Sequence, residues 1–118
     1  RHNTVLSSPD ATAHAEINAL RTACKVAGQV HLPDAIVAPT CEPCPMCMAA
    51  LHWARVKTVY YGASIADAQA AGFNELPIPA GELLQRGRSS VELVGQVLRE
   101  QCRQLFQQWL ALPEHKSY

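Results

Sequence analysis

The chain has 118 residues, a formal net charge of zero at pH 7 and 48% apolar residues. This length and composition suit one small domain with a single core. The balanced charge argues against a protein that binds by neutralising many phosphates, although a nucleic acid bound at a local patch stays open. Neither a membrane-spanning apolar run nor a cleavable signal pattern is found, so we expect a cytoplasmic protein with no membrane partner.

Residues 1–12 are polar and turn-rich, which predicts a loop. After it, apolar spacing and turn residues predict an alternation of helices and strands. Helices are predicted over residues 13–27, 45–54, 64–71 and from Leu98 to the stop at Pro113, and strands over residues 35–38, 58–61 and 91–94. Residues 73–87 are rich in Gly and Pro and predict a loop with one helical turn at Leu83-Leu84. Residues 114–118 are expected to be a free tail unless something holds them.

This alternation predicts an α/β fold in which short parallel strands are covered by helices on both faces. In such folds, ligands bind beyond the carboxyl ends of the strands. We therefore expect the functional site at that edge of the sheet, where helices begin.

Two short motifs carry candidate chemistry: His14-Ala15-Glu16, and Pro43-Cys44-Pro45-Met46-Cys47 about thirty residues later. One imidazole and two thiolates are ligands that zinc prefers, and catalytic zinc sites use three protein ligands so that water takes the fourth position. Both motifs lie at predicted helix starts, where the helix dipole favours thiolates. Glu16 is too close to His14 in sequence to bind the same ion easily, so we interpret it as a base beside bound water.

A structural zinc site or a chance Cys-x-x-Cys pair is the simpler alternative. Structural sites usually close with a fourth ligand, and Cys41 is the nearby candidate. Cys41 precedes the predicted helix and is expected at the end of the preceding strand. Three of the five cysteines fall within residues 41–47, which favours a metal in a reducing compartment over disulfides. Cys24 and Cys102 are predicted to be small core residues.

His-x-Glu followed by Pro-Cys-x-x-Cys is the motif of zinc-dependent nucleobase deaminases. With the runs at residues 10–21, 40–55, 67–75 and 116–118, the chain resembles the cytidine deaminase-like zinc superfamily, and within it most closely the bacterial guanine deaminases. The resemblance implies a three-layer αβα sandwich with a mixed, mostly parallel central sheet. It also implies a homodimer, often with exchanged C-terminal segments. The family's N-terminal helix and β-hairpin are not matched ahead of Arg1. We therefore expect the single deaminase domain over residues 1–118 either to be N-terminally incomplete or to receive the missing wall of its pocket from elsewhere.

The same resemblance assigns a role to eight residues. His14, Cys44 and Cys47 would bind one zinc ion, Glu16 would move the proton, Asn3 would hydrogen-bond the purine, Glu75 would be a second acid that helps the amine leave, Trp53 would wall the pocket, and Tyr118 would reach the substrate. At the position of Glu75 the family usually carries Asp.

The resemblance implies hydrolytic deamination of a free purine base, most closely guanine to xanthine plus ammonia. A tRNA adenosine deaminase is the nearest rival, although residues 97–112 carry only Arg99 and Arg103 against Glu100, a poor match for a phosphate-binding helix. A pyrimidine deaminase, such as one that acts on cytosine, is disfavoured by the purine-type run at residues 71–75. Deamination of another aminated heterocycle stays open, because such compounds present the same amine and ring nitrogen. The non-enzymatic alternative is a zinc-stabilised interaction module. We expect a small-molecule purine substrate rather than a nucleic acid.

Overall fold

The computed structural model describes residues 1–118, with five helices and three strands. In chain order they are α1 (Ala15–Ala27), β1 (Ile36–Val37), α2 (Pro45–Trp53), β2 (Thr58–Tyr60), α3 (Ile65–Ala70), α4 (Ala80–Arg86), β3 (Glu92–Val94) and α5 (Arg99–Leu110). Every predicted element is present, with bounds that differ by a few residues. None of the helices is long and apolar enough to span a bilayer.

The ends of the first three helices follow from local chemistry. Gly28 ends α1 in the left-handed conformation, with φ of 64°, which glycine adopts without strain. Pro45 occupies the first turn of α2, where its missing N–H has no cost. The predicted capping box opens α3, because Ser64 and Asp67 each accept from the other's backbone N–H.

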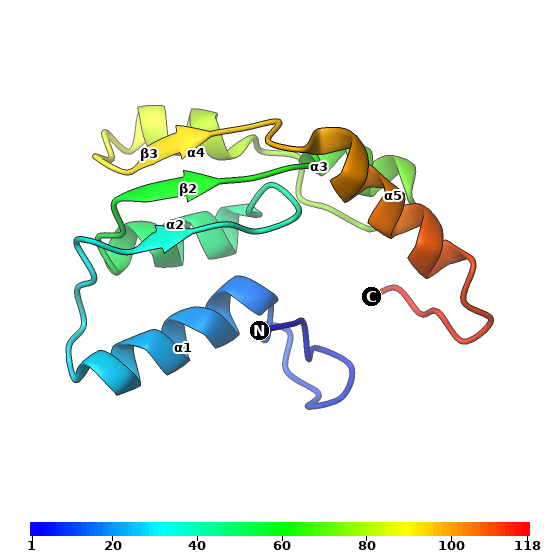
Figure 1. Ribbon diagram of the computed structural model, residues 1–118, viewed down its shortest axis with the longest axis horizontal. Helices are drawn as coiled ribbons and strands as arrows, with labels where there is room; N and C mark the ends of the chain where they lie inside the picture. The colour runs from blue at the N-terminus through cyan, green and yellow to red at the C-terminus, as the bar shows by residue number, and fades with distance from the viewer.

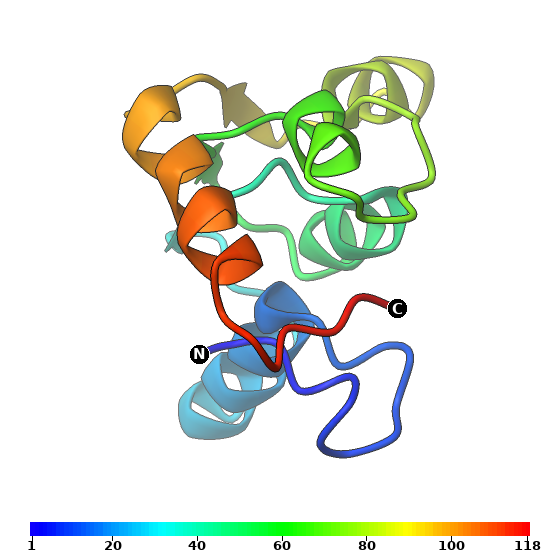
Figure 2. The same cartoon turned by 90° about the vertical axis from the view of Figure 1, so that its right-hand side faces the viewer.

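The three strands form one parallel sheet in the order β1-β2-β3 (Figure 1). In register, Val37 pairs with Val59 and Val59 with Leu93, so these three side chains point to the same face. Helices α2 and α4 pack on that face and against each other (Figure 2). The predicted α/β class with parallel strands is confirmed.

The core lies between this face and the two helices. Its most deeply buried side chains include Met48, Leu51 and Val59, each 0% exposed. Burying an apolar side chain of this size stabilises the fold by roughly 1.5–3 kcal/mol. Because Met48 and Leu51 come from α2, the core fixes the helix that begins at the second metal-binding motif.

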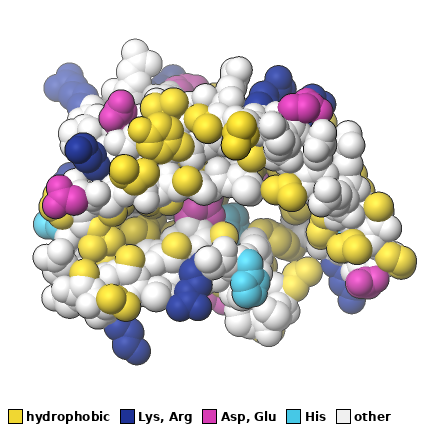
Figure 3. Space-filling model, in the orientation of Figure 1, with side chains coloured by type: hydrophobic (Ala, Val, Ile, Leu, Met, Phe, Trp, Pro, Cys, Tyr) yellow, Lys and Arg dark blue, Asp and Glu magenta, His cyan; other side chains and the backbone are white.

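The opposite face of the sheet is open in this chain. Ile36 is 62% exposed and Tyr60 36% exposed. Figure 3, in the orientation of Figure 1, shows hydrophobic side chains gathered over this face. The helix layer expected there is therefore not supplied by residues 1–118.

The predicted loop over residues 73–87 is partly wrong, because residues 80–86 form the helix α4. Two nearby prolines and Gly81 mask a helical period in the sequence. Ala80 and Leu84, one turn apart, are nevertheless buried against the core. Tertiary packing forms this helix where local propensity does not predict it.

Helix α5 lies beyond the carboxyl ends of the strands and contains no buried residue (Figure 1). Cys102, predicted to be in the core, is only half-buried, as is Cys24. Cys102 approaches the chain so closely at Gly62 that an added Cβ would clash with the Cys102 side chain. Gly62 is therefore needed for α5 to come close to the end of β2.

Candidate zinc centre

The starts of α1 and α2 bring three metal-binding side chains together. His14 is the N-cap residue of α1, Cys44 is the N-cap residue of α2, and Cys47 lies in the first turn of α2. One ligand atom from each lies within 4.8 Å of the others, and the His14 Nδ1 is 3.7 Å from the Cys44 sulfur. One imidazole nitrogen and two sulfurs are a ligand set that suits zinc.

Cys41 is not a member of this group. Its backbone pairs with Ala63 in an isolated parallel bridge, and its thiol lies 3.8 Å from the Ser64 carbonyl oxygen, to which it donates. Burial raises the pKa of the Cys41 thiol to about 12. The protein therefore offers three ligands rather than four, which is the arrangement of a catalytic zinc site.

The environment of the three ligands favours a thiolate at Cys44. Hydrogen bonds from the Cys47 thiol and the His14 ring hold the pKa of Cys44 well below the usual value of a thiol. The same contacts raise the pKa of His14, through its bond to the Cys44 sulfur, and raise the pKa of Cys47, which shares its proton with Cys44. A bound cation deprotonates coordinating thiols, so both sulfurs are available to zinc.

Two carboxylates line one cavity with His14 and Cys44. The cavity has a volume of about 630 Å³, within the usual range for small-molecule sites. Glu16 comes from the first turn of α1, and Glu75 from the loop between α3 and α4. Burial is the main cause that raises the pKa of each carboxyl group. The structure thus places both predicted acids beside the metal-binding group.

The two ends of the chain meet over the same cavity. The Asn3 side-chain amide donates to the Tyr118 hydroxyl, and the Tyr118 ring lies edge-on to His14, with ring centroids 5.9 Å apart. Figure 2 shows the C-terminal tail crossing from the end of α5 toward the start of α1. The tail, expected to be free unless something holds it, is thus held through its last residue. Asn3 and Tyr118, both predicted to contact the substrate, line this cavity.

Trp53 does not reach the cavity. It ends α2, nine residues after Cys44, and a helix rises about 1.5 Å per residue, so the two lie at opposite ends of α2. Its side chain is 69% exposed and contacts His52 edge-on. The prediction that Trp53 walls the pocket of its own chain does not agree with this structure.

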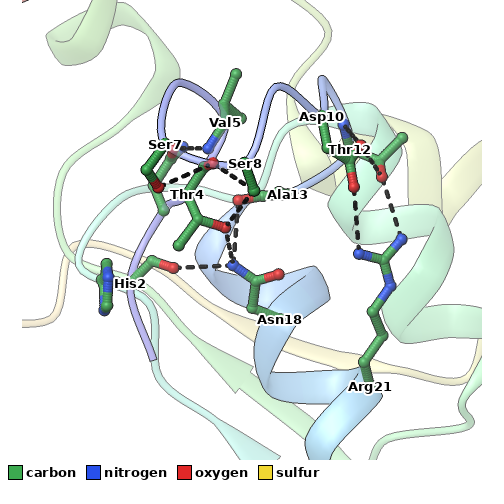
Figure 4. Close-up of polar contacts among 11 residues, drawn as sticks. His2, Thr4, Val5, Ser7, Ser8, Asp10, Thr12, Ala13, Asn18 and Arg21 are labelled. Carbon is green, nitrogen blue, oxygen red and sulfur yellow. Dashed lines mark hydrogen bonds and ion pairs between the residues drawn. The ribbon is translucent and has the colours of Figure 1, made fainter.

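Asn18 has a structural role that the sequence did not indicate. Its side-chain amide donates to the His2 carbonyl at 3.0 Å, the Thr4 hydroxyl at 3.0 Å and the Ala13 carbonyl at 3.2 Å. Figure 4 shows these bonds joining α1 to the N-terminal loop. Asn18 thereby fixes the loop that carries Asn3. In the sequence, only the position of Asn18 one helical turn after His14 could have suggested that it contacts this loop.

Glu42 is the second residue that sequence reasoning missed. It is a buried acid directly before Pro43 and Cys44, only 9% exposed. A single acid in the Thr-Cys-Glu-Pro-Cys run carries no local signal for its partners, because those partners lie more than twenty residues away in the sequence.

Comparison with known proteins supports this geometry. The family described as the cytidine and deoxycytidylate deaminase zinc-binding region matches residues 1–63. Over 73 residues the chain is 53% identical to the guanine deaminase of Bacillus subtilis, covering 62% of this chain and 47% of the relative. Over 54 residues it is 54% identical to the tRNA-specific adenosine deaminase of Agrobacterium fabrum, covering 46% of this chain and 36% of the relative. The chain thus spans half or less of the length of these relatives.

Among solved structures, the chain is similar to the guanine deaminase of Nitrosomonas europaea. The TM-score is 0.80 at 28% identity, with 93% of this chain and 63% of that chain covered. This likeness confirms the predicted deaminase-like fold.

Proposed function

The chain belongs to the cytidine and deoxycytidylate deaminase zinc-binding family, and from this premise we propose that it hydrolyses free guanine to xanthine and ammonia. The observation that carries the proposal is the three-ligand group of His14, Cys44 and Cys47, with Glu16 and Glu75 in the same cavity. A site with three protein ligands leaves a position for water, which a closed structural site does not.

Zinc bound to these ligands would supply a Lewis acid and lower the pKa of a water molecule toward neutrality. Glu16 takes a proton from the attacking water and delivers it to the ring nitrogen next to the amine-bearing carbon. Glu75 takes the proton of the added hydroxyl group as the carbonyl forms and passes it to the amine, so that the carbon–nitrogen bond breaks and ammonia leaves. Asn3 and Tyr118 orient the purine, since both contribute polar groups at the mouth of the cavity.

A free base fits better than an anticodon loop because the cations of α5 are already engaged. Arg99 and Arg103 both pair with Asp67, at 2.8 Å and 3.3 Å, and Arg103 also pairs with Glu100 at 3.2 Å. Phosphate contacts dominate nucleic-acid affinity, and paired arginines serve them poorly. Deamination of adenosine in tRNA is the second candidate, favoured by the identity to the Agrobacterium enzyme.

One assay separates these functions. Ammonia release by the zinc-loaded chain would be measured with free guanine, cytosine, adenosine and a stem-loop RNA at matched concentrations. We expect release from guanine, with xanthine as product. Release from the RNA alone would favour the tRNA function, and no release from any substrate would favour an interaction module.

We also propose a homodimer in the cytoplasm. The open sheet face with Ile36 and Tyr60 supports a second copy as its cover. In this structure Tyr118 reaches the cavity of its own chain. Light scattering on the purified chain tests the dimer: the mass of two chains is expected, and the mass of one would refute it.

A further inference from the structure

Glu42 is a buried carboxylate that the proposed chemistry does not use. It immediately precedes Pro43 and the metal ligand Cys44. Its Oε2 accepts from the backbone N–H of Ile65 and its Oε1 from the backbone N–H of Ala80, both at 2.9 Å. Because backbone donors engage both oxygens, Glu42 is not free to act on a substrate itself.

The two donors begin two different helices. Ile65 is the first residue of α3 and Ala80 the first residue of α4. The first N–H groups of a helix have no partner within it, and the positive end of the helix favours a carboxylate. In α4 the N-cap residue Pro79 offers no side-chain bond, so Glu42 replaces the missing cap. One side chain thus joins the starts of both helices.

The chain between these two bonds carries Glu75. The connecting segment, residues 71–79, makes its backbone bonds within itself and to the two flanking helices, such as Phe73 to Ala68 of α3 and Leu83 of α4 to Pro79. Its two flanking helices are fixed by Glu42. The backbone N–H of Glu42 also donates to the Ala63 carbonyl at 2.7 Å. A short chain of bonds therefore links the Cys44 loop to the Glu75 segment.

We infer that Glu42 is a positioning residue that fixes Glu75 relative to the zinc ligand Cys44. The inference rests on the proposed function, in which Glu75 protonates the departing amine. Two neighbouring residues would then have different roles: Cys44 binds the metal, and Glu42 fixes the position of Glu75.

The test is a double-mutant cycle with Glu42→Gln and Glu75→Gln. The amide of Glu42→Gln accepts through one oxygen only, which frees the start of one helix. We expect kcat on guanine to fall about 10- to 100-fold, since small misplacements of a reacting group have effects of this size. KM and zinc content are expected to change little. In the Glu75→Gln background the same substitution should change kcat less than about twofold, because the two residues act as a unit.

Ser89→Ala is the matched control. Ser89 makes two hydrogen bonds, with His52 at 2.7 Å and with the Val91 N–H at 3.3 Å, and lines none of the cavities described above. Removing the Ser89 hydroxyl eliminates two side-chain hydrogen bonds, as many as the Glu42 carboxylate accepts, at a position outside the cavity. We expect kcat on guanine to stay unchanged. Glu42→Asp, which keeps the charge but is one methylene group shorter, is a second variant in case Glu42→Gln fails to fold.

Hydrogen–deuterium exchange gives a readout besides activity. In the zinc-loaded protein, amides of residues 72–78 should exchange faster in Glu42→Gln and not in Ser89→Ala. Equal losses of kcat in both Glu75 backgrounds, or unchanged exchange in this segment, would overturn the inference. A wild-type chain inactive on guanine would instead refute the proposed function, and the exchange result would then decide the positioning role alone.

Discussion

Two regions of the molecule meet at the cavity, and different contacts hold them in place. The candidate zinc ligands lie at the starts of α1 and α2, and α2 contributes Met48 and Leu51 to the core. The C-terminal segment, residues 99–118, contains no buried residue and is held by ion pairs to Asp67 and by aromatic contacts to Phe73. Exposed polar contacts contribute about 1 kcal/mol or less each, against roughly 1.5–3 kcal/mol for a buried apolar side chain.

Because the two regions are held by contacts of different strength, we expect them to contribute differently to the proposed function. In the metal-binding region, the core holds α2 through Met48 and Leu51, and the start of α1 is buried at Ala13 and Ile17. The C-terminal segment, which carries Tyr118, is held by weak contacts to segments that are far away in the sequence. Changes in the first region should abolish the reaction, whereas changes in the second should weaken substrate binding or stability by smaller amounts.

The largest expected effect is the loss of a metal ligand. Cys47→Ala leaves one sulfur and one imidazole, so stoichiometric zinc and ammonia release should both be lost. A ligand that binds only the folded state stabilises it, so zinc should raise the melting temperature of the wild type but not of this variant. Calorimetry with and without zinc measures this. Cys41→Ala is the control and should bind zinc like the wild type; loss of zinc in this control would contradict the three-ligand centre.

Glu16→Gln should separate chemistry from metal binding. The amide cannot accept a proton, and general acid–base groups contribute about 10²- to 10⁴-fold to rate. We expect kcat on guanine to fall by at least that range while zinc content, measured by mass spectrometry of the metal, stays at one per chain. Wild-type turnover in a zinc-loaded variant would remove Glu16 from its role.

Asp67→Asn tests the attachment of the C-terminal segment. Hydrogen bonds from Arg99 are the main cause that lowers the pKa of Asp67 from 3.8 to about 2. Because the folded-state value is the lower one, the stabilisation is complete above pH 4 and is lost as the pH falls through 2. Asp67 also belongs to the capping box of α3, so we expect a loss of about 1 kcal/mol in the free energy of unfolding at pH 7.

Urea unfolding between pH 7 and pH 2 measures the difference in the free energy of unfolding between the wild type and Asp67→Asn. This difference should be constant at neutral pH and become smaller below pH 4. A difference that grows on acidification would contradict the assigned ion pairs. Glu82→Gln is a suitable control, because it removes the exposed pair with Arg86, at 3.1 Å, which joins neighbouring turns of α4 only.

The smallest effect is expected for Tyr118→Phe. The ring that lies against His14 stays, and only the hydroxyl that accepts from Asn3 is removed. A hydrogen bond contributes about 1 kcal/mol net, which corresponds to about fivefold in affinity. Steady-state kinetics should show KM for guanine raised by about that factor with kcat little changed. A fall in kcat with unchanged KM would place Tyr118 in the chemical step.

The sequence predicted features set within one helical turn better than features that depend on residues far away in the chain. Gly28, Pro45 and the Ser64–Asp67 box act within a single turn, so local pattern located the helix ends. His14 and Cys44 could be placed together because both stand at such ends. The α4 helix and the contacts of the tail depend on residues distant in the sequence, and no local pattern reports them.

The site residues divide in the same way. Trp53 lies on a predicted helix, but its distance from the cavity follows from the direction of α2 relative to the metal, which spacing alone does not give. Glu42 and Asn18 bond to backbone groups of other segments, so their partners became known only from the folded chain. The candidate metal ligands and acids were predicted from the sequence, whereas the residues that hold them in place were not.

X-ray absorption spectroscopy of the zinc-loaded chain tests the central claim most directly. We predict one zinc with two sulfur ligands at about 2.3 Å, one imidazole nitrogen at about 2.0–2.1 Å and one oxygen from solvent. The spectrum of Cys41→Ala should be the same. A third sulfur in the wild type that disappears in Cys41→Ala would show a closed structural site and would contradict the catalytic centre proposed for His14, Cys44 and Cys47.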